Sequence, residues 1–230
     1  MFIFETHLHT FPCSACAKDR NLAFVDRAAE LGLSGLVITN HFYCGNTGID
    51  RALPWADFVN AYVEDYRIAR AYGEEKGVAV LFGLEDGFGG GKEMLVYGLP
   101  PEAVQEHPEL KTLPPAEKAA LFRSLGGFVV CAHPFRHRSY IPEPVVAPDT
   151  AYFDGMEVEN ACNAPEENRQ AAVLCQQSGL RPTAGSDAHR TDGLGKAGVA
   201  FYDRVTDSRE FVQALTEGQY TLYIKEEQNS

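Results

Sequence analysis

Two histidines, His7 and His9, lie two residues apart near the start of the chain, in the stretch ETHLHT. The residues before them, FIFET, are rich in aromatic and β-branched side chains, which favours a strand. Side chains two apart in a strand point to the same face, so one strand could present both imidazoles to one metal ion. Taken alone, the fragment fits a pair of histidines on a solvated strand face equally well.

Five more residues of ligand type follow other apolar runs. His41 follows VITN, Glu85 follows LFGL, His133 follows VVCA, and Asp187 and His189 follow PTAGS. The chain has 7 histidines, and five of them belong to this combined set. Core packing does not explain why five strand ends should carry only His, Glu and Asp. The pattern therefore predicts a metal centre.

The ligand types indicate which metals the centre would bind. Imidazole and carboxylate suit zinc, iron or manganese better than calcium or magnesium. Seven ligands exceed what one tetrahedral zinc needs, and a carboxylate can bridge, so we expect two or three divalent ions. Two ions about 3.5–4 Å apart can clamp a displacement at phosphorus and generate hydroxide at neutral pH.

The elements that must position these residues alternate along the chain. Strand-like apolar runs cover 2–6, 35–40, 78–84, 93–99, 127–132, 155–160, 181–186 and 198–202, and helix-like stretches cover 21–33, 55–77, 164–179 and 207–217. This alternation predicts a mostly parallel sheet buried on both faces. In a barrel of parallel strands the carboxyl ends share one rim, which is where active sites are built. The ligand-type residues should meet there.

Length and composition fit one α/β barrel domain over residues 1–230. We expect its core at about 2–204, a C-terminal helix and strand over 207–224, and a tail at 225–230. No apolar run could span a membrane, and the first strand begins at once, so we expect a cytoplasmic protein. The six cysteines should then be thiols rather than disulfides.

The charge balance limits the partners. A net charge of −12 disfavours a broad nucleic-acid surface, because such affinity comes mostly from Lys and Arg. A small phosphorylated substrate remains compatible, because clustered cations can make a local positive site. The sequence predicts no oligomeric state.

The motifs THLHT, ITNH, GLE, AHP and GSDAH, in this order, resemble those of the PHP family, the polymerase and histidinol phosphatase domain. The resemblance runs from residue 3 to about residue 200. It implies a distorted (β/α)7 barrel of TIM-like form, a three-metal site and phosphoesterase activity.

The same resemblance implies a distribution of ligands. One metal would take His7, His9, Glu85 and Asp187, a second would share Glu85 and take His133, and a third would take His41 and His189. A metal-bridging hydroxide would attack, and Asp187 would hold a metal and orient that hydroxide.

The chain departs from the family pattern at three positions. Asn40 stands where many members have Asp, Ala15 where some have His, and Leu95 where another His is common. The second and third metals are then each one protein ligand short. Water, substrate phosphate or a nearby side chain could complete them, and the candidate side chains are Cys13, Cys16 and Glu159.

Arginines near the ligands are candidates for phosphate binding. Arg136 and Arg138 follow His133 in HPFRHR, and Arg190 follows DAH. Arg suits bidentate contact with phosphate, so we expect Arg136, Arg138 and Arg190 to bind substrate and Arg136 to have a catalytic role as well. A solvated basic loop is the alternative interpretation.

Other readings of the same residues stay open. Cys13, Cys16, His41 and Cys44 form a C-x2-C…H-x2-C array that could bind structural zinc, or could be small buried thiols. Besides a phosphoesterase for a small metabolite or nucleotide, the sequence allows a 3′/5′ exonuclease-type phosphodiesterase on short oligonucleotides. It also allows an amidohydrolase-like enzyme acting on a C–N bond, or a domain that binds metal without catalysis.

Overall fold

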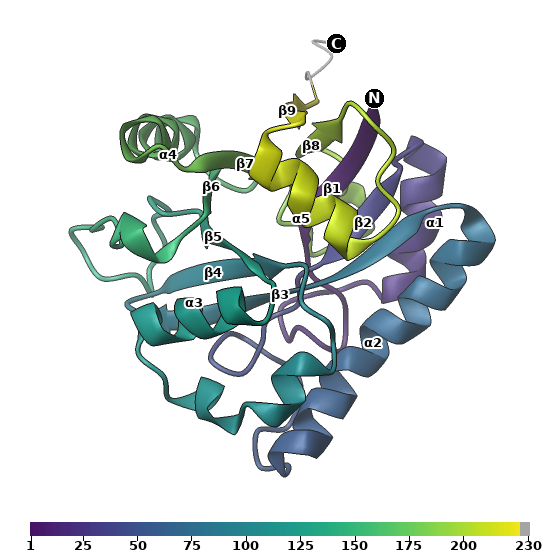
Figure 1. Cartoon of the computed structure of the whole chain (residues 1–230), viewed down its shortest axis with the longest axis horizontal. Coiled ribbons are helices and arrows are strands. Elements are labelled where there is room, and N and C mark those ends of the chain that lie inside the picture. The colour runs from purple at the N-terminus through teal and green to yellow at the C-terminus, as the bar shows by residue number, and fades with distance from the viewer. Residues whose placement is uncertain (226–230) are drawn as a thin grey trace.

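The structure is a computed structural model that describes residues 1–225, so most of the expected tail lies outside the described residues. The elements alternate as predicted (Figure 1). They are β1 (Phe2–Leu8), α1 (Asn21–Leu31), β2 (Gly35–Ile38), α2 (Trp55–Lys76), β3 (Ala79–Gly89), β4 (Lys92–Tyr97), α3 (Pro115–Ser124), β5 (Phe128–Ala132), β6 (Gly155–Asn160), α4 (Pro165–Ser178), β7 (Arg181–Gly185), β8 (Ala197–Phe201), α5 (Ser208–Glu217) and β9 (Tyr220–Ile224).

The helices expected from the sequence are present with nearly the expected bounds. Four of them, α1, α2, α4 and α5, end at a glycine in the left-handed conformation, at Gly32, Gly77, Gly179 and Gly218. Glycine adopts that conformation without a steric cost, so these residues mark the helix ends in the sequence. The helix α3 was not expected from the sequence, because it has only a weak apolar stripe.

The strands form one sheet in the order β7-β6-β5-β4-β3-β2-β1-β8-β9. The neighbours β1, β2 and β3 are parallel to one another, as are β5, β6 and β7. The strand β4 is antiparallel to both of its neighbours, β3 and β5, and β8 is antiparallel to both β1 and β9. The expectation of a mostly parallel sheet was therefore wrong, because half of the neighbouring pairs in the described chain are antiparallel. A tight turn of three left-handed glycines, Gly89–Gly91, folds β3 and β4 into a hairpin.

The sheet curls into a nearly closed barrel. The gap between β1 and β7 is bridged at their carboxyl ends, where His9 N donates to Ala188 O at 2.8 Å and Ala188 N donates to His7 O at 3.1 Å. The Thr6 hydroxyl also donates to Ala184 O. The predicted distorted barrel is confirmed, with more strands than the seven expected.

Apolar side chains fill the barrel and cover its outside as two separate clusters. The inner cluster includes Phe4, Tyr97 and Phe201 from the strands and Phe211 from α5. The Phe211 ring centroid lies 5.6 Å from that of Phe4, 5.6 Å from Tyr97 and 5.2 Å from Phe201. The helix α5 therefore packs against residues of the barrel interior, while α1 to α4 contribute to the outer cluster.

A shift of register in β1 decides which of its side chains face inward. The pairing of β1 with β2 shifts between Glu5 and Leu8, and Phe4 packs in the inner cluster while Leu8 packs in the outer one. The buried Glu5 carboxylate holds this shift, because its Oε1 accepts from the backbone N–H groups of Thr6, His7 and Ser186 at 2.8–3.0 Å. Although Glu5 is a buried acid beside His7, its role here is structural.

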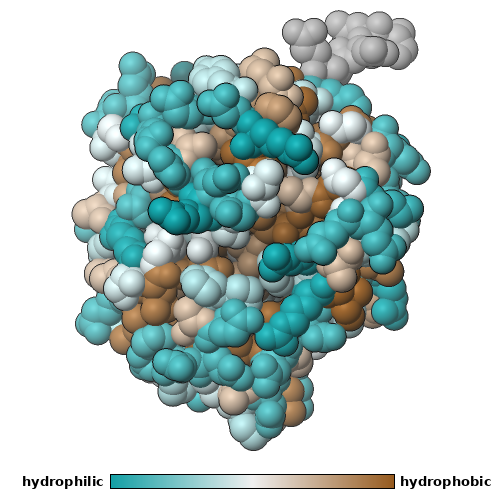
Figure 2. Space-filling model, turned by 45° about the vertical axis from the view of Figure 1, so that its right-hand side comes forward, coloured by the Kyte–Doolittle hydropathy of each residue, from teal (hydrophilic) through white to brown (hydrophobic). Residues whose placement is uncertain are grey.

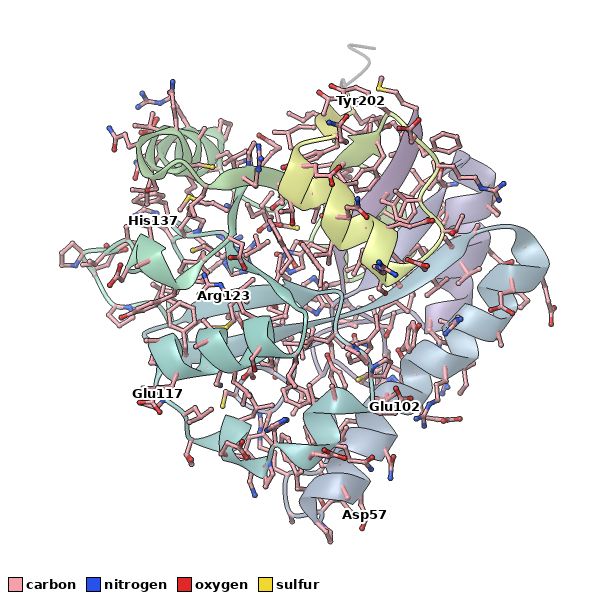
Figure 3. The ribbon with its side chains drawn as sticks, viewed as in Figure 1. Asp57, Glu102, Glu117, Arg123, His137 and Tyr202 are labelled. Atoms are coloured by element: carbon pink, nitrogen blue, oxygen red, sulfur yellow. The ribbon has the colours of Figure 1, made fainter. Side chains whose placement is uncertain are left out.

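Two ion pairs attach α3 to the barrel. Lys118, which is buried, donates to Asp86 Oδ2 at 2.5 Å, and Arg123 Nε donates to Asp154 Oδ1 at 2.8 Å. Figure 3 labels Arg123 on α3, in front of the sheet. Asp86 Oδ1 also accepts from Cys44 N at 2.7 Å, so one buried carboxylate links α3, β3 and the segment after β2.

Polar side chains cover much of the face shown in Figure 2, with apolar residues between them. None of the helices within residues 1–225 combines the length and the apolar character needed to cross a bilayer.

We predict that Lys118→Met lowers the free energy of unfolding by about 3–5 kcal/mol, because it leaves Asp86 charged, buried and unpaired. Urea denaturation measures this change. The double variant Lys118→Met/Asp86→Asn, which keeps an oxygen for Cys44 N, should regain most of the loss. Equal stability of both variants and the parent would show that the pair is not a structural anchor.

Candidate metal centre

The structure brings all seven predicted ligand residues together at one end of the barrel. We call this set the rim cluster: His7, His9, His41, Glu85, His133, Asp187 and His189. All are buried except His189, which is partly exposed. Their nitrogen and oxygen atoms form overlapping groups of three whose members lie within 4.8 Å of one another.

Glu85 lies at the middle of the rim cluster. Its Oε1 is 3.2 Å from His7 Nε2 and 3.0 Å from His133 Nε2. Its Oε2 is 2.9 Å from His41 Nδ1 and 3.5 Å from His9 Nε2. Each carboxylate oxygen therefore faces a different pair of imidazoles, which is the arrangement that a carboxylate bridging two ions requires.

Asp187 also lies close to His7 and His9. Its Oδ1 is 3.3 Å from His9 Nε2 and 3.5 Å from His7 Nε2, while its Oδ2 binds the Arg136 guanidinium. Arg136 thus fixes the carboxylate so that one oxygen is directed at both histidines.

The surrounding hydrogen bonds place a proton on Nδ1 of three histidines, so that in the neutral form of each ring the lone pair is on Nε2. His7 Nδ1 lies 2.8 Å from a Glu157 carboxylate oxygen, and His189 Nδ1 lies 2.9 Å from the backbone oxygen of Asp187. His9 Nδ1 lies 3.2 Å from Ser14 Oγ, whose own proton is donated to Asn40. Each Nδ1 must therefore carry the proton, which is the usual form of a metal-ligating histidine.

The charges of the rim cluster depend on one another. Burial lowers the pKa of His7 and His41, but neighbouring carboxylates outweigh it and hold both pKa values well above the usual range. Burial would raise the pKa of Glu85, yet His7 and His41 hold it well below its usual value. Burial and the nearby His41 lower the pKa of His9 to about 3. These acids need positive charge beside them, and metal cations would supply it.

One buried nitrogen lacks a partner. His41 Nδ1 lies close to Glu85 but not in hydrogen-bond geometry, and it makes no hydrogen bond. A buried polar atom without a partner is costly, and a bound cation would satisfy it. The donor set, the Nε2 atoms of the neutral histidines and this nitrogen all fit divalent metal ions.

Two rim residues have a backbone conformation that is unusual for non-glycine residues. His133 has φ of 28° and Asp187 has φ of 52°. Such strain costs free energy and is concentrated at functional sites. His133 comes directly after β5, and Asp187 comes shortly after β7. The strained turns at these strand ends direct both side chains into the rim.

Several solved structures share this fold at low sequence identity. A two-domain protein from Bacteroides vulgatus, described as containing a predicted PHP-like metal-dependent phosphoesterase, matches with a TM-score of 0.72 and 16% identity over 97% of this chain and 64% of that one. A protein from Bifidobacterium adolescentis, proposed to be a metal-dependent phosphoesterase, matches with a TM-score of 0.60 and 18% identity over 92% of this chain and 95% of that one. The lesion-specific endonuclease PfuEndoQ from Pyrococcus furiosus matches with a TM-score of 0.67 and 11% identity over 96% of this chain and 57% of that one.

The fold is of the PHP type. A family model described as PHP-associated also matches residues 165–220, which include β7 and the segment that carries Asp187 and His189. No curated protein sequence matches the chain. The resemblance to the PHP family seen in the sequence motifs is thus confirmed for the fold.

Glu93 also lies beside the rim cluster, and the sequence did not predict it. Its Oε1 lies 3.3 Å from His41 Nδ1, and its Oε2 lies 3.6 Å from His133 Nε2. Because β4 is antiparallel to β3, its amino end lies at the rim where the other strands have their carboxyl ends. The glycine turn Gly89–Gly91 before Glu93 is the sequence signal that the chain reverses direction between β3 and β4.

Glu157 was missed as well, and its neighbour Glu159 was proposed instead. The register of β6 against β7 shifts between these two residues. Glu157 is buried, its Oε1 lies 2.8 Å from His7 Nδ1, and its Oε2 accepts from His133 N at 3.0 Å, whereas Glu159 is partly exposed. Neither glutamate belongs to the ligand groups found in residues 1–225. Gly185 on β7 leaves room for His7 and Glu157 to lie side by side, since a Cβ at this position would lie 2.5 Å from His7 Cβ and 2.9 Å from Glu157 Oε1.

The cysteines separate into different environments. Cys16 lies beside the rim cluster: burial raises the pKa of its thiol, but hydrogen bonds to His189 and His41 lower it to about 6. Cys13 is buried, and its thiol donates to Tyr62 O at 3.8 Å. The sulfur of Cys44 accepts from Lys118 Nζ at 3.4 Å. The structure does not bring Cys13, Cys16, His41 and Cys44 together as a zinc site.

Asn40 does not face the metal centre directly. Its Oδ1 accepts from Thr10 N at 2.7 Å and from Ser14 Oγ at 2.8 Å. Its Nδ2 donates to Asp65 Oδ2 at 3.1 Å, which fixes the orientation of the amide. Asn40 therefore positions Ser14, and through it His9, and the nearby negative charge belongs to Asp65 on α2.

A cavity of about 620 Å³ opens beside the rim cluster. Cationic and polar side chains that line it include Arg136, Arg138, Lys92 and Tyr140, whereas Arg190 does not line it and is exposed beside Asp192. Another cavity, of about 590 Å³, lies at the amino ends of β1, β2 and β3 and contains no residue of the rim cluster. The first cavity is the candidate substrate site.

We predict that Glu157→Gln weakens metal binding by about 10–100-fold, because the amide donates to His7 Nδ1 and shifts its proton to Nε2. Metal affinity can be measured by calorimetric titration of chelator-treated protein. Glu159→Gln on the same strand is the matched control and should bind metal like the parent. Equal effects of the two changes would contradict the assignment of Glu157.

We also predict that Asn40→Asp lowers the free energy of unfolding by about 1–3 kcal/mol, because an acceptor then faces the Asp65 carboxylate. The double variant Asn40→Asp/Asp65→Asn restores an acid–amide pair and should recover part of this loss in thermal denaturation. An Asn40→Asp variant as stable as the parent would show that Asp65 does not fix the Asn40 amide.

Proposed function

We propose that this protein is a metal-dependent hydrolase that cleaves phosphate esters of a small substrate, using two or three divalent ions. The observation that carries the proposal is the position of Glu85, whose two oxygens each face a different pair of histidines. This arrangement suits a carboxylate shared between ions, and the strained His133 and Asp187 turns suit a site built for function rather than for packing.

The ligands fall into three proposed positions. His7, His9, Glu85 and Asp187 would hold one ion, Glu85, His133 and Glu93 a second, and His41 and His189 a third. Zinc, iron or manganese suits these donors. When bound, such ions make water a nucleophile at neutral pH and neutralise charge on a phosphoryl group.

The chain's own residues would orient the reacting groups. Arg136 donates to Asp187 Oδ2 and to Asn160 Oδ1 at 3.0 Å, so it holds Asp187 in place for its proposed catalytic role. Glu157 and Ser14 hold the rings of His7 and His9. The rim is thus organised before any substrate enters, which reduces the cost of ordering it during the reaction.

Cations on the cavity wall would bind the phosphate. Lys92 Nζ is held by Pro134 O at 2.6 Å, and Arg138 is held by His137 O and Cys162 O at 2.7 and 2.8 Å. Both line the cavity with donors left over, together with Arg136. Charge-assisted hydrogen bonds of this kind favour a phosphate over a neutral amide.

The size of the cavity favours a small ester. A volume of about 620 Å³ is in the range of small-molecule sites. A net charge of −12 disfavours a long nucleic-acid strand. Cleavage of short oligonucleotides is the second candidate, because one neighbour in fold is an endonuclease.

The experiment is a substrate panel on chelator-treated protein reloaded with zinc, manganese or iron(II). The panel holds phosphomonoesters of metabolites and nucleotides, short oligonucleotides, and amides. We expect cleavage of monoesters, with kcat/KM reduced about 100-fold or more in His133→Ala. His107→Ala is the matched control, since His107 pairs with Glu109 away from the rim, and it should keep the parent activity.

Cleavage of oligonucleotides or amides without monoesters would overturn the substrate class. No cleavage of any member by metal-loaded protein, or cleavage that His133→Ala leaves intact, would overturn the proposed hydrolase.

A further inference from the structure

One buried amide lies between two of the acids beside the histidines of the rim cluster. Asn160, the last residue of β6, is fully buried. Its Nδ2 donates to Glu157 Oε2 at 2.9 Å and to Asp187 Oδ2 at 3.4 Å. The amide nitrogen carries two hydrogens, so one side chain can serve both carboxylates.

The orientation of the Asn160 amide is fixed by its other partners. Its Oδ1 accepts from Arg136 Nη2 at 3.0 Å and from Cys162 N at 2.9 Å, and both of these groups can only donate. A rotation of the amide by half a turn would set its NH2 group against these donors and its oxygen against the two carboxylates. The amide must therefore present both of its hydrogens to Glu157 and Asp187.

The backbone of Asn160 is held from a neighbouring helix. Asn160 N donates to Asn168 Oδ1 at 3.2 Å, and Asn168 Nδ2 donates back to Asn160 O at 3.1 Å. Asn168 lies on α4, so this helix fixes the end of β6. The side chain of Asn160 is thus preorganised by contacts that involve no metal ion.

Both carboxylates act on ligands of the same proposed ion. We call the ion proposed for His7, His9, Glu85 and Asp187 the first ion. Glu157 Oε1 lies 2.8 Å from His7 Nδ1, and Asp187 Oδ1 lies 3.5 Å from His7 Nε2 and 3.3 Å from His9 Nε2. Asn160 therefore contacts one ligand of the first ion directly and a second one through Glu157.

The ligands of the other proposed ions have no such link to the amide. Within residues 1–225, Asn160 makes no hydrogen bond to His41, His133 or His189. The backbone nitrogen of His133 donates to Glu157 Oε2, but that contact does not involve Asn160. The amide is therefore connected to one ion position rather than to the whole centre.

We propose that Asn160 is a positioning residue for the first ion, because its uncharged amide fixes the carboxylates of Glu157 and Asp187 together. The inference rests on the metal-dependent function proposed above. An amide suits this place, since it donates two hydrogen bonds and adds no positive charge that would repel the ion. Groups that orient metal ligands in this way determine metal affinity without binding the metal.

The test compares zinc binding in Asn160→Ala and Asn160→Ser, because neither new side chain can reach both carboxylates. Chelator-treated protein is titrated with zinc in a calorimeter, and the zinc that stays bound is counted by elemental analysis. The binding step that Asp187→Ala removes identifies the first ion. We expect this step to weaken about 10–100-fold in both Asn160 variants, while the other ions keep the affinities that they have in the parent.

Asn163→Ala is the matched control. Asn163 lies three residues further along the chain and accepts from Arg136 Nε at 2.9 Å, but it contacts neither carboxylate. It should bind every ion like the parent. A merely structural role of Asn160 would lower the free energy of unfolding in urea without a selective effect on the first ion.

The outcomes separate the inference from the proposed function. Zinc binding like the parent in both Asn160 variants, or an equal loss at every ion, would overturn the positioning role and leave the metal centre standing. No zinc binding by the folded parent would overturn the proposed function and the inference with it.

A measurement on the parent keeps the inference testable if circular dichroism shows that neither Asn160 variant folds. The two side-chain amide protons of Asn160 can be followed by nuclear magnetic resonance. We expect them to be protected from exchange with solvent and to shift when the first ion binds. Protons that exchange like those of an exposed amide, or that do not shift, would overturn the inference.

Discussion

The structure depends on holding the Glu85 carboxylate inside the barrel among four imidazoles. A buried charge is tolerated only when opposite charge and hydrogen bonds surround it. Here Asp187, Glu93 and Glu157 lie beside the same histidines, so the rim concentrates negative charge, of which Arg136 offsets part at Asp187. Divalent cations would balance it, and the Nδ1 hydrogen bonds of His7, His9 and His189 leave Nε2 as the ligand atom of each neutral ring.

Irregularities in the sheet serve this one requirement. The shift in β1, held by Glu5, lets Phe4 pack in the inner cluster and brings His7 and His9 to the rim. The register shift in β6 lies between Glu157, which is buried, and Glu159, which is partly exposed. The reversed strand β4 delivers Glu93 from its amino end. A regular parallel barrel of this sequence would not bring these side chains together.

The sequence predicted the alternating elements and the seven residues that the structure gathers at the rim, because residues at the carboxyl ends of parallel strands meet in space. It did not predict Glu93, since that prediction needs the direction of β4. It could not choose Glu157 over Glu159, because residues two apart share one face of a regular strand, and only the register shift between these two separates them. It could not separate Cys16 from Cys13, which are three residues apart in an irregular loop. The helix α3 was missed because only Ala119 and Phe122 form its buried apolar side, while the adjacent Lys118 makes a buried ion pair with Asp86.

The measurement that tests the central claim most directly is elemental analysis of protein purified without chelator. The account predicts two or three equivalents of zinc, iron or manganese per chain. It also predicts that Glu85→Gln removes at least one equivalent while the protein stays folded, because Glu85 faces more than one proposed ion. One equivalent or none in the parent, or a metal content that Glu85→Gln leaves unchanged, would contradict a centre built around this carboxylate.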